Sequence, residues 1–174
     1  AGLARTITGD HGPSVPVRVG PCPSEALSFA QERLWFLEQL DPGTAAYNVP
    51  GEVRITGPLE IERLSSAFAE IVRRHEILQT VYEARAGAPS PAKRGRAGEG
   101  VQSVDLSALP TKEKEAARHA REEARRPFDL AEGPVVRALL LRLGPEEHRL
   151  LVTFHHIASD GWSLGLFLDE LAAL

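Results

Sequence analysis

The sequence predicts an α/β fold: a two-layer sandwich in which helices pack against a mixed β-sheet. Helix-like and strand-like segments mix along the chain without a strict β-α-β order, which favours a mixed sheet over a purely parallel one. The chain has 174 residues, 43% of them hydrophobic and 25% charged, as is typical of one globular domain with a buried core. Residues 1–23 are rich in Gly and Pro and are predicted to be a flexible lead-in, and residues 24–174 to form the domain.

The first predicted elements are a helix, a strand and a second helix. Ser28 and Gln31 have the spacing of a capping box and open a helix that stops at residues 41–43, where Pro and Gly follow Asp. Residues 47–56 alternate apolar with polar or small side chains, which predicts a strand. Apolar residues recur at helical spacing over residues 59–75, so this segment is predicted to be an amphipathic helix.

The middle of the chain has weaker signals. Residues 78–83 and 101–104 are predicted to be short strands. Residues 85–100 between them are rich in Gly, Ala, Pro and basic side chains, which predicts a disordered loop. Residues 111–126 form a highly charged helical segment, and its charges are interpreted as a solvated face rather than a binding patch.

The last third predicts a hairpin and a helix. Residues 135–143 and 148–154 are apolar and β-compatible, and they flank a short turn segment at 144–147. Residues 162–174 carry leucines and a phenylalanine at helical spacing, which predicts a helix with a core-facing stripe.

Composition excludes several classes of protein. The net charge of −4 gives no basic surface for nucleic acid or anionic lipid. No apolar run approaches the roughly 20 residues of a membrane span, and no secretory signal opens the chain. Cys22 is the single cysteine, so no internal disulfide can form. We therefore expect a cytoplasmic protein, and the lack of any Met, even at position 1, suggests a piece of a longer chain.

Residues 155–161 are the segment most suggestive of chemistry. His155, His156, Asp160 and Gly161 lie between an apolar strand and an apolar helix. Histidine is the side chain best suited to moving a proton near neutral pH. A loop of this composition between a strand and a helix predicts an active site.

Three chemical readings of this loop compete. His155, His156 and Asp160 could ligate zinc, but neighbouring side chains on a strand point to opposite faces, so no metal site is predicted. Ser159 lacks the Gly-x-Ser-x-Gly turn that exposes a nucleophilic serine. General base catalysis remains: one histidine faces the core, the other faces a cleft, and Gly161 permits close backbone approach to a developing oxyanion. The alternative hypothesis is that both histidines are structural.

Three ordered motifs match a known family. Residues 155–163 resemble the active-site motif of nonribosomal peptide synthetase condensation domains. Residues 28–37 and 74–82 resemble the first and second core motifs of these domains, and residues 127–130 also match the usual sequence of the family at that place. The resemblance covers roughly residues 24–174.

This resemblance implies a fold and an activity. The family fold is two chloramphenicol-acetyltransferase-like halves that form a V, and this chain corresponds to the N-terminal half domain. The family joins an upstream acyl or peptidyl thioester to the amine of a downstream aminoacyl thioester. The implied partners are carrier protein domains, whose 4'-phosphopantetheine arms hold both substrates, and the missing C-terminal half; the chain itself is expected to bind no cofactor and, alone, to be inactive.

The resemblance also assigns roles residue by residue. His156 matches the catalytic histidine, and Gly161 matches the glycine whose backbone approaches the thioester. Asp160 matches an aspartate that forms an ion pair with the arginine matched by Arg74, and His155 matches the inward, supporting histidine. These four positions and Arg74 agree with the family pattern.

One departure and several alternatives accompany this assignment. The family usually has a second arginine where this chain has Gln79, so any ion pair made by that arginine is in doubt. An epimerization domain of the same superfamily fits residues 28–37 less well. A stand-alone acyltransferase would need a homotrimer to build its site. A non-catalytic module that docks carrier domains could use Trp35, Phe36 and Trp162, although core packing is the more common fate of such residues.

Overall fold

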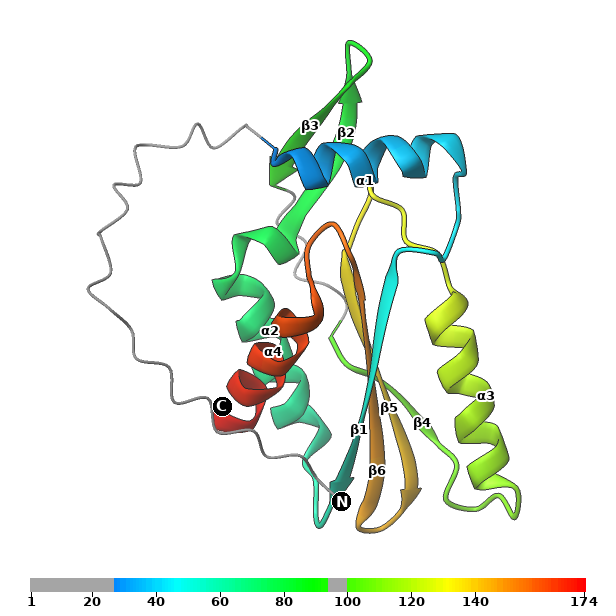
Figure 1. Cartoon of the computed structure of the whole chain (residues 1–174). Helices are drawn as coiled ribbons and strands as arrows, with labels where there is room; N and C mark the ends of the chain where they lie inside the picture. The colour runs from blue at the N-terminus through cyan, green and yellow to red at the C-terminus, as the bar shows by residue number, and fades with distance from the viewer. Residues whose placement is uncertain (1–26, 94–99) are drawn as a thin grey trace, which may run out of the picture.

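The computed structural model describes residues 27–93 and 100–174, so the predicted lead-in at 1–23 lies outside the described residues. The helices are α1 (Phe29–Leu40), α2 (Ile61–Arg74), α3 (Lys112–Arg125) and α4 (Gly161–Ala173), with a 3-10 turn η1 (Glu76–Gln79). The strands are β1 (Asn48–Thr56), β2 (Thr80–Arg85), β3 (Ala88–Lys93), β4 (Gln102–Asp105), β5 (Val136–Gly144) and β6 (Glu147–His155). Figure 1 shows the long strands at the centre, with α1 lying across one end of them.

The central sheet has four strands in the order β1-β6-β5-β4. β1 and β5 both run antiparallel to β6, whereas β4 is parallel to β5. The predicted hairpin is confirmed, because β5 and β6 pair directly across the turn after Gly144. The sheet is therefore mixed, as the sequence predicts.

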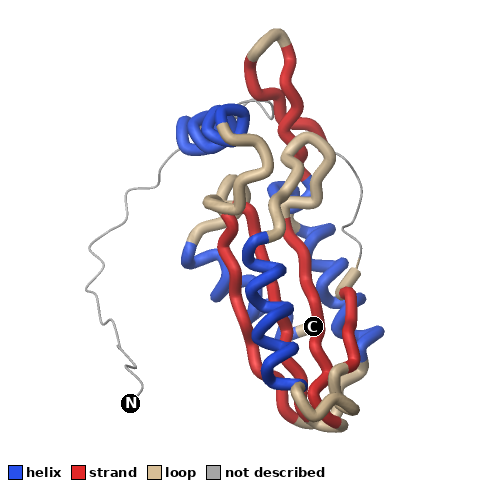
Figure 2. Tube along the Cα trace, turned by 90° about the vertical axis from the view of Figure 1, so that its right-hand side faces the viewer, coloured by secondary structure: helices blue, strands red, loops and turns tan. Residues whose placement is uncertain are grey.

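Helices cover both faces of the sheet. Ala138 and Leu140 of β5 belong to the core cluster that contains Phe167 of α4 and four buried residues of α2. The alternate residues Leu139 and Leu141 belong to a second cluster with Ala116 of α3. Figure 2 views the molecule from the side of α3, which lies along the sheet. The α/β class is confirmed, and α3 adds a third layer to the two that the sequence predicts.

A separate hairpin corrects the loop predicted at 85–100. Residues 88–93 form β3, which pairs antiparallel with β2. The turn between them places Ala86 at φ 51° and Gly87 at φ 80°, the positive values that a tight two-residue hairpin turn requires. Pro89 and Pro91 are two positions apart, so their nitrogens, which carry no hydrogen to donate, can both lie on the outer edge of the strand, where no partner strand needs a donor. Composition alone misses this strand because its hydrogen bonds depend on β2; residues 94–99 of the predicted loop lie outside the described residues.

The strand predicted at 78–83 begins two residues later than expected. It starts at Thr80, because Leu78 and Gln79 belong to η1. In the part of the chain that the structure describes, no helix has the length and apolar character needed to cross a membrane.

Candidate active site

The two adjacent histidines lie at the end of β6 and face opposite ways. The backbone N–H of His155 donates to the carbonyl of Val135 at 2.9 Å, and that of His156 donates to the carbonyl of Tyr47 at 2.8 Å. Strand alternation therefore continues to the end of the strand. His155 is 1% exposed, whereas His156 is exposed to solvent. His155 thus faces the core and His156 faces solvent; that His156 faces a cleft stays a prediction.

A short hydrogen bond orients the ring of His156. Its Nδ1 lies 2.6 Å from the backbone carbonyl oxygen of Ser159. A carbonyl oxygen can only accept, so Nδ1 must carry the proton. In the neutral ring the lone pair is then on Nε2, which has no hydrogen-bond partner within the described parts of the chain. The loop thus presents a histidine with a defined tautomer and a free basic nitrogen.

His155 is held neutral inside the protein. Its Nδ1 accepts a hydrogen bond from the backbone N–H of Ile157 at 3.1 Å. Its ring packs edge-on against Phe128 at 5.9 Å and tilted against Tyr47 at 6.1 Å. Burial, and secondarily the charge of His156, lowers the pKa of His155 from 6.5 to about 4. His155 therefore shapes the turn and is not available as a base near neutral pH.

The groups around His156 support neither a nucleophilic serine nor a metal site. The Ser159 hydroxyl is buried and donates to the carbonyl of His155 at 3.3 Å, so it serves the turn rather than acting as an exposed nucleophile. Across residues 27–93 and 100–174, no group of three or more His, Cys, Asp or Glu side chains is arranged to hold a metal ion. Of the three hypotheses, this geometry favours general base catalysis by His156.

Asp160 is the N-cap of α4. Its Oδ1 accepts from the backbone N–H groups of Trp162 at 3.1 Å and Ser163 at 2.9 Å, and from the Ser163 hydroxyl at 2.7 Å. The Ser163 hydroxyl in turn accepts from the Asp160 backbone N–H at 3.1 Å, which completes a capping box. The hydrogen bonds from Ser163, then from Trp162, lower the pKa of Asp160. This carboxylate is thus engaged locally, and it joins the histidine loop to the first turn of α4.

The prediction of an ion pair between Asp160 and Arg74 is wrong: the two side chains do not pair in this structure. Arg74 instead binds Glu70 through Nε at 2.8 Å and Glu170 through Nη1 at 3.1 Å. The physical reason is that Asp160 is already satisfied by the cap of its own helix, while two other carboxylates lie within reach of the guanidinium. Arg74 reaches α4, but near its last turns rather than at its start.

Gly161 is the first residue of α4, and the packing of this chain does not require a glycine there. Its φ is not positive, and a Cβ added to it would meet nothing within 4 Å. The space beside the first turn of α4 is therefore open. This is compatible with close approach of another molecule to the Gly161 backbone.

The first core motif supports the loop from behind, a role that sequence reasoning missed. Gln31 donates through Nε2 to the carbonyl of Ile157 and to the Tyr82 hydroxyl, both at 3.4 Å. Trp35 donates through Nε1 to the carbonyl of Tyr82 at 3.2 Å, and Trp35, Tyr82 and Ile157 share one buried cluster. Burial raises the pKa of Tyr82 to about 12, so its hydroxyl stays protonated. No local signal points to these contacts, because Gln31 and Ile157 are 126 positions apart.

The segment at 127–130 supports His155 from the other side. The Phe128 ring contacts His155 and is covered by the Arg137 guanidinium, 4.0 Å from the ring centroid. Arg137 is held by an ion pair with Glu123 at 2.9 Å and by backbone carbonyls at the end of α3. Leu130 accepts from the backbone N–H of Tyr82 at 2.7 Å. The matched motif at 127–130 thus packs against the buried side of the histidine loop.

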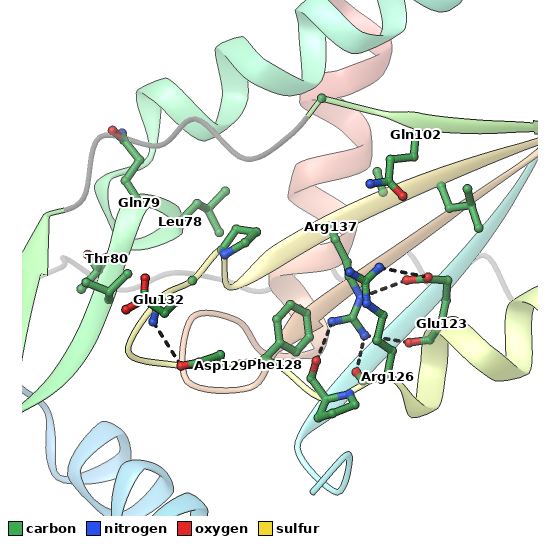
Figure 3. A pocket seen from close by; sticks show the side chains of 17 residues that line it. Leu78, Gln79, Thr80, Gln102, Glu123, Arg126, Phe128, Asp129, Glu132 and Arg137 are labelled. Atoms are coloured by element: carbon green, nitrogen blue, oxygen red, sulfur yellow. Dashed lines mark hydrogen bonds and ion pairs between the residues drawn. The ribbon is translucent and has the colours of Figure 1, made fainter. Parts of the chain in front are cut away.

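A cavity of about 570 Å³ lies next to residues 127–129, between η1, β2, β4 and the start of β5. Phe128, Arg137 and Gln79 are among its lining residues, and Figure 3 shows the Arg137–Glu123 pair at its edge. Residues 155–161 do not line it. Gln79, which stands where the family has an arginine, donates to the carbonyl of Arg73 at 2.9 Å. The cavity is therefore separate from the exposed ring of His156.

Comparison with known proteins agrees with these motifs. Residues 24–174 match the profile of the condensation domain family. The chain is 44% identical over 167 residues to phosphinothricin tripeptide synthetase PhsC of Streptomyces viridochromogenes, covering 93% of this chain and 15% of that protein. It is 41% identical over 150 residues to chondramide synthase cmdD of Chondromyces crocatus, covering 85% of this chain and 4% of that protein. The chain thus spans only a small part of the length of these relatives.

Solved structures show the same fold. The first condensation domain of the CDA synthetase superposes with a TM-score of 0.77 at 30% identity, over 85% of this chain and 39% of that one. The starter condensation domain of rhizomide synthetase RzmA gives a TM-score of 0.79 at 24% identity, over 85% of this chain and 36% of that one. The fold is thus the predicted chloramphenicol-acetyltransferase-like one. With three ordered motifs gathered around one loop, this chain belongs to the condensation domain family of nonribosomal peptide synthetases and is an N-terminal part of such a domain.

Proposed function

We propose that this segment supplies the catalytic histidine of a domain that forms peptide bonds. The amine of an aminoacyl thioester attacks the carbonyl carbon of an acyl or peptidyl thioester; the C–N bond forms and the C–S bond breaks. Nε2 of His156 accepts the proton that the amine loses and returns it to the departing thiolate, so the products are an amide and a thiol. The observation that carries this proposal is the exposed His156 ring, whose Nδ1 proton is held by the Ser159 carbonyl.

The start of α4 is proposed to stabilise the charge that develops on the carbonyl oxygen. The first N–H groups of a helix carry partial positive charge and lack intrahelical partners. Asp160 uses the N–H groups of Trp162 and Ser163, which leaves the Gly161 backbone as the group nearest the loop. The open space where a Cβ would stand supports this role, because an oxyanion needs close approach to its donors.

The substrates and partners are proposed from the family. Both thioesters are expected on 4'-phosphopantetheine arms of carrier protein domains, so the chain needs no cofactor of its own. The rest of the condensation domain is proposed to cover Trp162 and Leu166, which are 81% and 70% exposed, lie one turn apart on α4 and adjoin the histidine loop. The segment alone is therefore expected to be inactive.

Replacing His156 tests the proposal. In an intact condensation domain that carries this segment, His156→Ala should reduce dipeptide formation on the acceptor carrier by about 10²–10⁴-fold, because proton transfer to a positioned base contributes that much. The rate is measured by mass spectrometry of the loaded carriers. His119→Gln, on α3, is the control and should keep the wild-type rate. Equal rates for His156→Ala and wild type would refute the assignment.

The same samples separate condensation from epimerization. Condensation lengthens the acceptor-bound chain by the donor group, whereas epimerization changes only the configuration of one Cα. An unchanged mass with inverted stereochemistry would therefore favour the epimerization domain over the proposed function.

A further inference from the structure

Glu170 connects α4 to the second core motif. Its Oε1 accepts from Arg74 Nη1 at 3.1 Å, and its Oε2 accepts from His75 Nε2 at 2.7 Å. Arg74 is the last residue of α2 and His75 is its C-cap, so both partners lie at one point in the fold. Hydrogen bonds from His75 and then Arg74 lower the pKa of Glu170, which keeps it a carboxylate. Both oxygens of this side chain are thus committed to the end of α2.

The apolar contacts of α4 form one stripe along the helix: Leu164, Leu168 and Leu171 are partly buried against the same core cluster as Phe167. Phe167 is buried and packs edge-on against Phe68 at 5.8 Å and Phe154 at 5.2 Å. Trp162 and Leu166 instead face solvent. Because hydrophobic burial is non-directional, this stripe favours burial of one side of α4 without specifying polar partners for the helix. The two charge-assisted contacts of Glu170 add directed contacts between α4 and the end of α2.

A shift at Glu170 is transmitted to the histidine loop. Glu170 is nine positions after Gly161, which is about 14 Å along the helix. The Asp160 capping box joins the helix to the loop, and the Ser159 carbonyl in that loop holds His156 Nδ1. Figure 1 shows α2 and α4 side by side, and they are in direct contact. The position of the basic nitrogen therefore depends on how α4 is seated.

We infer that Glu170 is a positioning residue for the reaction proposed above: it holds α4 against the end of α2 and thereby fixes His156 and Gly161 relative to the substrates. The inference rests on the proposed function. It gives Arg74 a partner other than Asp160, and it gives His75 a role within the second motif. Glu170 itself lies outside all the motifs that the sequence analysis singled out.

Glu170→Gln in the intact condensation domain is the direct test. The side chains of Glu170 and Arg74 are 27% and 43% exposed, so loss of this pair should hardly change the unfolding midpoint. We expect kcat for dipeptide formation to fall about tenfold, with KM for the acceptor carrier within about twofold, because misplacement of a catalytic group by less than 1 Å has effects of this size. A purely structural role would change the folded fraction and leave kcat per folded molecule unchanged.

Glu70→Gln is the matched control. Glu70 binds the same arginine and is similarly exposed, at 31%, but it lies within α2 and does not reach α4. It should keep kcat within about twofold of wild type. The double variant Arg74→Gln/Glu170→Gln should be no slower than the slower single variant by more than about twofold, because both substitutions break the same link.

The outcomes separate this inference from the proposed function. An active wild type with unchanged kcat in Glu170→Gln, or multiplicative losses in the double variant, would overturn the positioning role and leave the proposed function standing. A wild-type domain without condensation activity would remove the proposed function first. If Glu170→Gln lowers the folded fraction, the double variant Arg74→Gln/His75→Ala is measured instead; it keeps Glu170 but removes both of its partners, and wild-type kcat in that variant would equally overturn the inference.

Discussion

His155 lies where a charged imidazole is strongly disfavoured. Its side chain is almost completely buried against two aromatic rings, and one ring nitrogen already accepts from the backbone of Ile157. Its Nε2 is buried with no hydrogen-bond partner among residues 27–93 and 100–174. Protonation of this ring would place a charge in a site that offers it no counter-ion, which makes the turn beneath His156 sensitive to acid.

Because of His155, the free energy of unfolding should therefore decrease as the pH is lowered. The pKa of this ring is about 4 in the folded chain and 6.5 as a reference for the unfolded chain. Between these values the unfolded chain binds a proton that the folded chain does not, so stability is fully present above about pH 6.5 and is lost as pH falls towards 4. The shift corresponds to about 2 kcal/mol of lost stability between pH 7 and pH 5.

Urea unfolding of wild type and His155→Phe at several pH values measures this effect. Phenylalanine retains the aromatic packing with Phe128 and Tyr47 but cannot titrate, so its stability should fall less steeply between pH 7 and pH 5. Parallel pH profiles for the two proteins would contradict the assigned burial cost. A lower but flatter profile for the variant is expected, because it also loses the acceptor for the Ile157 N–H.

At the scale of elements, α4 combines structural and chemical demands in one helix. Its first turn carries the cap at Asp160 and the glycine at 161, and its later turns carry Phe167 and the contact of Glu170. Glycine is unfavourable inside a helix, yet α4 contains a second one, Gly165. A Cβ on either glycine would meet nothing within 4 Å, so the two positions differ in their distance from the histidine loop rather than in local packing.

Alanine at these two glycines should separate stability from activity. Gly165→Ala should stabilise the protein by about 0.5–1 kcal/mol, because glycine has more conformational entropy to lose than alanine, and should leave condensation unchanged. Gly161→Ala should fold normally but lower kcat/KM, because the added methyl group would occupy the space through which the thioester is proposed to approach. Thermal unfolding and carrier-based condensation assays of the intact domain give the two readouts. Equal activities for the two variants would argue against a substrate contact at Gly161.

At the scale of the whole molecule, elements with a clear period were predictable and tertiary pairings were not. The alternation at 47–56 and the helical spacing at 59–75 match β1 and α2 to within a few residues, because each pattern reflects burial on one face. β3 was missed because it depends on a partner strand. The motif resemblance paired Arg74 with Asp160, whereas in the structure Asp160 is engaged by its own helix cap and Arg74 by Glu70 and Glu170. Residue identity is carried along the sequence, whereas the choice of partner depends on which groups the fold brings within reach.

The exposed edge of α4 gives a prediction about the assembled domain. The chain contains two tryptophans; Trp35 is 6% exposed beside Tyr82, and Trp162 is 81% exposed. If the remainder of the condensation domain covers Trp162 and Leu166, the indole of Trp162 leaves water while that of Trp35 keeps its surroundings. Tryptophan emission of a Trp35→Phe variant, with any tryptophan of the remainder also replaced by Phe, should then lie at shorter wavelength in the intact domain than in the isolated segment, because a less polar environment shifts indole emission to the blue. Trp162→Phe is the control and should show little shift, since Trp35 is buried in both forms. An emission maximum of Trp162 that is the same in the segment and in the intact domain would place the interface with the remainder elsewhere, and the open flank of the histidine loop would then have to be closed by a different surface.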